Sequence, residues 1–222
     1  MSATPAHPLV GRGILAVWNN REATIAAEYE RWYVGEHLPE RVGVDGFHWG
    51  RRYEAVTDTA ARRFFTYYQT DDPAVLASPA YRARLAAPSP WTGRIMAHWR
   101  DMVRVVARRR HHAGGAFVSA HVAVARFDTG PPPWAALTAA VDDVAGDDAV
   151  LAAELWEAVS DDGATVEAGL RDGPDAGAAG AALVHGVDAM AVTRAAEKLA
   201  ALAPADLTTY RFLSGLESQR KD

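Results

Sequence analysis

The spacing of hydrophobic and polar residues predicts the first elements of the chain. An apolar run over residues 13–18 predicts a buried strand that ends at Asn19 and Asn20. Asn20 is suited to cap the helix that follows. In that helix, apolar positions recur every three or four residues and therefore share one face: Ile25, Tyr29, Trp32 and Tyr33.

We expect this helix to end at Gly35. Glycine tolerates the positive φ that commonly ends a helix, and Pro39 prevents the helix from resuming with full hydrogen bonding. Glu36 and His37 would then lie at the helix exit beside an aromatic cluster. Side chains in such a place can point into a cavity.

Two aromatic segments follow and predict an antiparallel hairpin. Residues 46–56 alternate, which places four large side chains on one face of a strand: Phe47, Trp49, Arg51 and Tyr53. Residues 63–69 form the second strand. Helical pieces are then predicted from Ser78 and over residues 91–98, before a strand at 100–107. The order is β-α-β-β-α-β, the ferredoxin-like split unit.

The same order is predicted again after residue 115. Residues 108–115, an arginine and histidine run followed by two glycines, are expected to be a linker. Helices are predicted after Pro131 and from Asp188, and residues 161–180 predict a loose connection because they are rich in glycine, aspartate and alanine. Residues 149–160 suit a strand or a short helix, and the strand fits the repeat. The strands expected are 116–127, 149–160, 181–187 and 207–213.

These elements predict an α+β fold of two ferredoxin-like units, residues 12–107 and 116–215, between tails at 1–11 and 216–222. Each unit would cover one sheet face with its helices and leave the other face bare. Burying apolar side chains is worth ~25 cal/mol per Å², so one bare face should pack on the other. We expect an internal α+β barrel with antiparallel sheets.

The first half also carries a recognisable pattern. The run WYVGEHLPER at residues 32–41, with VDGF at 44–47 and RRY at 51–53, resembles the dimeric α+β barrel superfamily, and within it the EthD-like and uncharacterised families. The resemblance covers residues 12–107 and implies a tandem duplication in one chain. It implies a pocket and relatives that include metal-independent monooxygenases, polyketide cyclases, haem-degrading proteins, peroxidases and dehydratases. Fold analogy does not choose among these activities.

Composition narrows the classes of function. The 222 residues are 49% hydrophobic and 23% charged, as in a globular protein with a core, and the net charge of −5 argues against broad nucleic-acid binding. There are no cysteines, which excludes disulfides and thiolate chemistry. With no signal-peptide pattern or apolar run long enough to cross a membrane, we expect a cytoplasmic protein, and the alanine and arginine content suggests a bacterial genome.

His37 is the main candidate for catalysis. Beside Trp32, Tyr33 and Glu36, its imidazole would act as a general acid or base on a carbonyl or phenolic substrate. The alternative is that His37 ties the helix end to a backbone carbonyl. Tyr33 and Tyr67 would orient a substrate oxygen.

Aromatic walls and nearby polar groups are the candidates for substrate binding, although the aromatic residues equally suit a packed core. They are Trp32, Glu36, Phe47, Trp49, Arg51 and Phe65. Arg51 and Arg52 fall on opposite strand faces, so one points inward. An inward arginine needs a carboxylate, from an acidic substrate or from a residue such as Glu28 or Glu40.

No cofactor or metal is expected. His48, His121 and His185 lie on predicted strands but lack close ligand spacing, and His98 does not stand in a pattern typical of haem-degrading proteins. The chain also lacks a phosphate loop, a dinucleotide fingerprint and a nucleophile elbow.

Two functions stay open at this point. The first is a cofactor-independent enzyme of lyase, cyclase, isomerase or monooxygenase type, acting on a small hydrophobic aromatic or carbonyl metabolite. The second is a non-catalytic small-molecule-binding or accessory protein. Neither hypothesis involves nucleic acid or membrane, and both allow a monomer with an internal pseudo-dimer or a homodimer.

Overall fold

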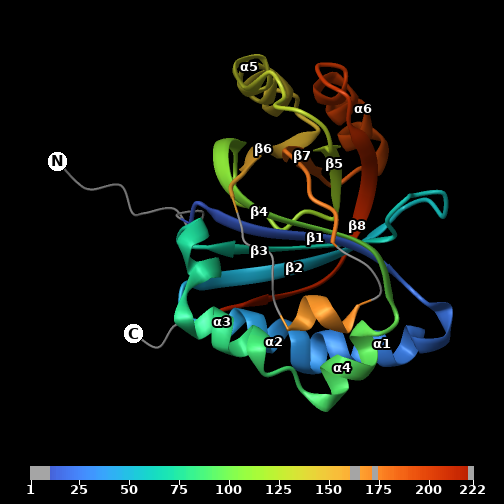
Figure 1. The fold of residues 1–222 in the computed structure, drawn as a ribbon. Helices are drawn as coiled ribbons and strands as arrows, with labels where there is room; N and C mark the ends of the chain where they lie inside the picture. Colours follow the sequence, from blue (N-terminus) through green and yellow to red (C-terminus); the bar gives the residue numbers. More distant parts are fainter. Residues whose placement is uncertain (1–10, 161–165, 172–174, 220–222) are drawn as a thin grey trace.

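Eight antiparallel strands close into a barrel. The computed structural model describes residues 11–160, 166–171 and 175–219. Around the barrel the strands follow the order β1-β3-β2-β8-β5-β7-β6-β4 (Figure 1). They are β1 (Gly13–Arg21), β2 (Phe47–Ala55), β3 (Phe64–Thr70), β4 (Trp99–Gly114), β5 (His121–Phe127), β6 (Val150–Ala158), β7 (Gly180–Gly186) and β8 (Asp206–Glu217).

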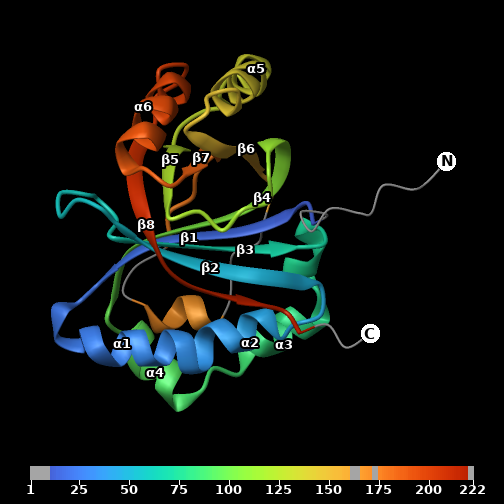
Figure 2. The same ribbon diagram turned by 180° about the vertical axis from the view of Figure 1, so that it is seen from behind.

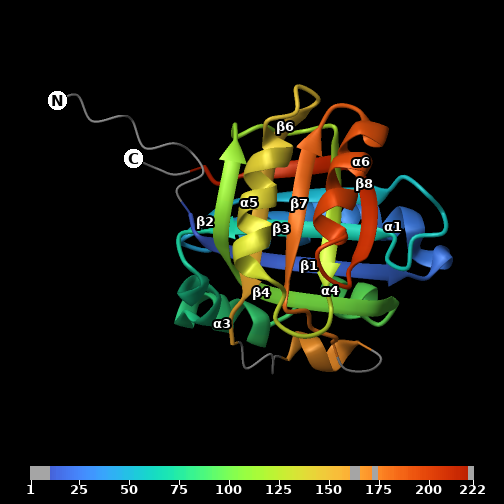
Figure 3. The same ribbon diagram turned by 90° about the horizontal axis from the view of Figure 1, so that it is seen from above.

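Helices cover two opposite sides of the barrel (Figures 1 and 2). One side carries α1 (Ala26–Trp32), α2 (Leu38–Val42), α3 (Pro79–Ala86) and α4 (Pro90–Met96), with a π-helical turn η2 (Tyr33–His37) and the 3-10 turns η1 (Ala23–Ile25), η3 (Pro73–Ala77) and η4 (Glu167–Leu170). The other side carries α5 (Trp134–Ala145) and α6 (Ala189–Ala200), which lie over the strands of the second half (Figure 3). No helix of the described residues is long and apolar enough to cross a membrane.

The apolar residues form three cores, in agreement with this layering. One fills the barrel and includes Trp18, Phe65, Tyr67 and Trp156. A second lies between the barrel and α1–α4, and a third between the barrel and α5 and α6. Six strands, all but β4 and β8, therefore bury most of both faces, one toward the barrel axis and one toward helices.

Two long strands join the halves of the barrel. β4 pairs with β1 over its first part and with β6 over its last part, and β8 pairs with both β5 and β2. Residues 108–114 are therefore strand, and our prediction of a linker there was wrong. Their backbone groups pair with β6, and Arg109 donates to Glu154 at 2.7 Å inside the barrel. A charged run can continue a strand when its partners lie on the neighbouring strand.

The order of pairing is the same in both halves. The first half runs β4-β1-β3-β2 around the barrel and the second runs β8-β5-β7-β6. The strand predicted at 149–160 is present as β6, and Asp188 caps α6 through the Ala191 N–H at 2.7 Å. The strand expected from residue 116 begins only at His121. Descent of the two halves from one ancestor stays a prediction.

The helix does not end at Gly35. Its φ is not positive, and the chain continues through the π-helical turn η2 into α2. The N–H of Leu38 bonds to the carbonyl of Tyr33 five residues back, and Pro39 falls in the first two positions of α2. A π turn interrupts the α-helical hydrogen-bond pattern, so the missing N–H of proline is tolerated there. Asn20 does not cap this helix either, because it lies in β1 and binds the Ala61 carbonyl.

A β-bulge changes the faces predicted for β2. The register shifts between Phe47 and Trp49. Because an inserted residue reverses the alternation that follows, Phe47 packs against Tyr81 on the helix side while Trp49 faces the barrel interior. Our prediction that Phe47 and Trp49 share one face was wrong.

Substitution of Gly35 tests whether the helix continues through this residue or ends there, and substitution of Gly50 provides a comparison. A Cβ at Gly35 meets nothing within 4 Å. Because alanine favours helix over glycine, Gly35→Ala should stabilise the protein by about 0.5–1 kcal/mol in urea unfolding. A Cβ at Gly50 lies 2.6 Å from the Tyr68 ring, so Gly50→Ala, the comparison variant, should lose about 1–3 kcal/mol. A loss of stability in Gly35→Ala would contradict the continuous helix.

Candidate functional site

A small cavity lies between the outer face of β1, β3 and β4 and the layer of α1–α4. Its volume is about 40 Å³, enough for about three water molecules. The apolar part of its lining comes from the strands and from α3 and α4. The residues that line it are Leu15, Val17, Tyr33, His37, Arg41, Tyr68, Tyr81, Leu85, Met96, Trp99, Met102, Arg104, Glu167 and Arg171.

His37 enters this cavity from the π-helical turn. Its side chain is 5% exposed, and its ring lies 4.4 Å from the Trp32 ring and 5.1 Å from the Tyr33 ring. Within the described chain, Nδ1 has no hydrogen-bond partner. His37 therefore does not tie the helix end to a backbone carbonyl through this nitrogen.

Three further buried polar atoms of the lining also lack partners among the described residues. They belong to Tyr68 (Oη), Trp99 (Nε1) and Arg41 (Nη1). Buried polar groups are normally satisfied, and leaving one unpaired costs about 1–3 kcal/mol. Four such atoms around one cavity make it a candidate site for a polar group from outside the protein.

Burial and nearby positive charge set the protonation of these groups. Burial, reinforced by the positive charges of Arg41 and Arg52, lowers the pKa of His37 well below its usual 6.5. Burial also raises the pKa of Tyr68 well above 10, so its hydroxyl keeps its proton. The cavity thus presents a neutral imidazole next to the hydroxyl, indole and guanidinium donors.

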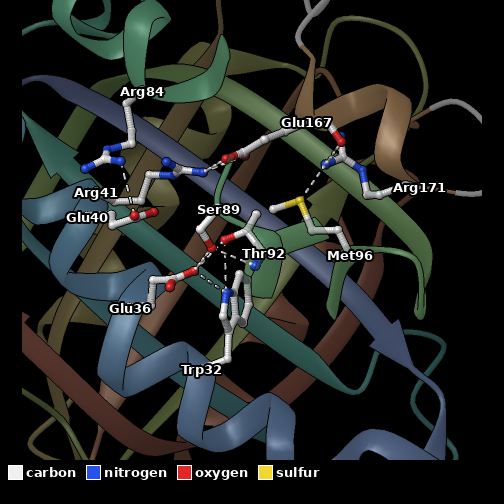
Figure 4. Close-up of polar contacts among 10 residues, drawn as sticks. All are labelled: Trp32, Glu36, Glu40, Arg41, Arg84, Ser89, Thr92, Met96, Glu167 and Arg171. Atoms are coloured by element: carbon white, nitrogen blue, oxygen red, sulfur yellow. Dashed lines mark hydrogen bonds and ion pairs between the residues drawn. The ribbon is translucent and has the colours of Figure 1, made fainter. Parts of the chain in front are cut away.

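An ion pair from a distant part of the chain closes one side of the cavity. Arg41 Nη2 donates to both carboxylate oxygens of Glu167, and the side chains are 3% and 6% exposed (Figure 4). Glu167 lies in η4, whose next residue, Arg171, binds Asp175 through two nitrogens and approaches Met96 Sδ at 3.9 Å. We expected a loose connection at 161–180. Its described residues 166–171 are anchored here, and residues 161–165 and 172–174 lie outside the described chain.

Glu36 has a different environment from the one we predicted. Its carboxylate accepts hydrogen bonds from Trp32 Nε1 at 3.1 Å, Ser89 Oγ at 2.5 Å and Thr92 Oγ1 at 2.8 Å (Figure 4). Despite partial burial, these bonds lower the pKa of Glu36. Glu36 therefore fastens the first turn of α4 to the π-helical turn. It holds Trp32 against His37 but does not line the cavity.

Four other predicted site residues lie inside the barrel, on the opposite face of the sheet from His37. Trp49, Phe65 and Tyr67 belong to the barrel core, and the guanidinium of Arg51 stacks on the Trp49 ring at 4.0 Å. Tyr67 and His37 are therefore not brought together. The cavity tyrosine from β3 is Tyr68, the next residue along the strand, because successive side chains alternate between faces.

The protein carboxylates predicted for the inward arginine, Glu28 and Glu40, are not its partners. Arg52 points to the helix layer, where it pairs with Glu30 at 2.7 Å and lies 3.9 Å from the Tyr33 ring. Arg51 points into the barrel and donates to the Phe117 carbonyl at 3.1 Å. Neither guanidinium pairs with Glu28 or Glu40.

Sequence reasoning did not find several lining residues. Arg41 follows His37 at the four-residue spacing that places both on one helical face, so this signal was present in the motif. Tyr68 could have been found by considering both faces of its strand. Trp99 and Glu167 lie 62 and 130 residues after His37, and nothing local connects them to it.

The chain matches no protein-family model and no curated protein. Solved structures do match its fold. An anthrone oxidase-like protein superposes with a TM-score of 0.61 at 9% identity, over 96% of this chain and 95% of that one. A monooxygenase-like protein of Lactobacillus acidophilus gives 0.56 at 8% identity, over 93% and 97%. A haem-binding protein of Thermus thermophilus gives 0.51 at 10% identity, over 92% of each chain.

These neighbours are antiparallel eight-strand barrels of the dimeric α+β barrel superfamily. This chain shares their fold, a closed barrel of eight antiparallel strands with helices outside it. At such low identity the likeness extends to the fold alone. The narrower resemblance to EthD-like proteins stays a prediction.

The site beside His37 does not fit a haem. An axial histidine needs a flat space of several hundred Å³ in front of its nitrogen, whereas this cavity measures about 40 Å³ and the His37 ring is enclosed by Trp32, Tyr33 and Trp99. His98 is half-buried and bonds to Glu22 at 2.7 Å through Nδ1.

The strand histidines are also engaged at separate places. His48 pairs with Asp71, His121 bonds to the Val187 carbonyl, and His185 contacts Ser119. Among the described residues, no group of three or more metal-ligating side chains gathers at one place.

The lowered pKa of His37 predicts that the free energy of unfolding decreases as the pH falls. The unfolded histidine titrates near 6.5 and the folded one well below, so the unfolded state binds more protons and stability falls as the pH drops below 6.5. Between pH 7.5 and 5.5 this residue should account for about 1.4 kcal/mol of lost stability. Urea unfolding of His37→Gln should show a correspondingly smaller loss. Equal losses in both proteins would contradict a buried neutral His37.

Proposed function

We propose that this protein is an enzyme in which His37 transfers a proton on a small hydrophobic aromatic or carbonyl metabolite. The observation that carries the proposal is the convergence of the unpartnered His37 Nδ1 with unpartnered donors of Tyr68, Trp99 and Arg41 on one buried cavity. An imidazole with a free nitrogen, held neutral, is suited to accept a proton at neutral pH.

The chemistry that fits is proton abstraction beside a carbonyl or from a phenol. His37 would take the proton, and negative charge would develop on the substrate oxygen. Donors fixed in a water-poor site stabilise such an oxyanion strongly. Tyr68, Trp99 and Arg41 supply them here, while Trp32 and Tyr33 hold the imidazole ring in place.

An enolate or phenolate formed in this way leads to several reaction types. Return of the proton to another carbon gives an isomerisation, and loss of a leaving group gives a lyase reaction. Reaction of the carbanion with dioxygen is the monooxygenase type. The anthrone oxidase-like and monooxygenase-like neighbours support including the last. The step assigned to His37 itself requires no cofactor.

The test is an activity assay on a panel of aromatic carbonyl compounds and phenols that includes anthrone. Substrate loss and product formation are measured by absorbance and mass spectrometry. His37→Gln should lower kcat about 10²- to 10⁴-fold on any compound turned over, because the general base is lost. His98→Gln serves as the matched control, since His98 lies outside the cavity and pairs with Glu22. A His37→Gln protein with unchanged kcat would contradict the role of His37.

A second function, non-catalytic binding, has one observation in its favour. The Arg41–Glu167 pair covers one side of the cavity, and a protein that encloses a ligand and protects it needs such a cover. Binding of a panel compound without turnover, with affinity lost in both His37→Gln and Tyr68→Phe, would establish that function instead.

A further inference from the structure

The Arg41–Glu167 pair has features of an exchangeable contact. Glu167 uses only Nη2 of Arg41, and Nη1, also buried, lacks a partner among the described residues. A carboxylate can engage two guanidinium nitrogens side by side, which is the stronger geometry. Glu167 therefore leaves part of the binding capacity of Arg41 unused.

The charge of the cavity lining favours an anion. The lining includes the buried guanidinium of Arg41, which pairs with the lining carboxylate of Glu167. Arg171 is engaged by Asp175. If Glu167 left its position, Arg41, which is 2% exposed, would be a buried cation without a counter-ion, an arrangement that proteins strongly disfavour.

Access to His37 requires that something move, because a cavity of about 40 Å³ does not admit a metabolite. Glu167 stands on η4, a four-residue turn that lies among α1–α4 (orange in Figure 1). Apart from the Arg41 pair, η4 contacts the helix layer through Leu170, which packs against that core, and through Arg171, which approaches Met96 Sδ. A short turn that is neither part of the barrel nor of a long helix can be displaced without breaking a strand or helix, so η4 is the part of the wall that we expect to move.

We propose that the natural ligand of this cavity is a small aromatic carboxylic acid, whose carboxylate takes the place of Glu167 on Arg41. This rests on the proposed function and names its substrate class. With a carboxylate ligand, Arg41 has an anionic partner both before and after the exchange. A neutral ligand that displaced Glu167 would leave the Arg41 guanidinium without one. The aromatic body of the acid would lie against the apolar lining, toward His37 and Tyr68.

The test is calorimetric binding of two probes of the same shape, benzoate and benzamide, at pH 7.5. The wild-type protein should bind benzoate at least tenfold more tightly than benzamide. Glu167→Gln should bind benzoate at least tenfold more tightly than the wild type, because the internal competitor is gone, and should bind benzamide no better. Arg41→Gln should lose the preference for benzoate.

Glu40→Gln is the matched control. Glu40 precedes Arg41 in sequence but pairs with Arg84 at 3.2 Å outside the cavity, so benzoate binding should stay within twofold of the wild type (Figure 4). If Glu167→Gln does not fold, Glu167→Asp keeps the charge with a shorter reach, and a smaller tightening is expected.

The outcomes separate the two proposals. Equal binding of benzoate and benzamide, or no tightening in the Glu167 variants, would overturn the acid preference. The proposed function would still stand if His37→Gln abolished turnover of neutral compounds. If neither probe binds and no compound is turned over, both proposals fall.

Discussion

Closure of the barrel is the constraint on which the rest of this structure depends. The long strands β4 and β8 each pair with both halves, so no strand edge is left open and each half completes the other. Closure turns one face of each strand toward a filled interior. The cavity beside His37 lies on the outer face, between the strands and the helices.

The π-helical turn is the local feature that shapes this site. A single α-helix through residues 26–42 would present a regular face, but the extra residue in η2 shifts the register between Trp32 and His37. In the observed register the Trp32 ring packs against the imidazole, and Glu36 is turned away to hold α4. Turns of this kind are frequent at functional sites because they re-aim side chains without ending the helix.

The site also shows how buried charge couples distant segments. Arg41 lies in the first half and Glu167 in the connection between β6 and β7 of the second, 126 residues away. The buried guanidinium requires a carboxylate, and in the described structure the second half supplies it. The second half thus contributes to the site of the first, although it lacks the sequence signature we recognised there.

The sequence alone determined most of the strands and helices, the α+β class, and the position of His37 beside Trp32 and Tyr33, because hydrophobic spacing acts over a few residues. Three predictions from the sequence were wrong: the linker at residues 108–115, the helix end at Gly35 and the strand face of Phe47. The first depended on pairing with β6, the second on a π turn, and the third on a β-bulge in the pairing of β2 with β3. Only the tertiary structure placed Tyr67 inside the barrel and Tyr68 in the cavity, and brought Trp99 and Glu167 to His37. Packing between remote segments decides which face of a strand meets helices, and local sequence does not encode it.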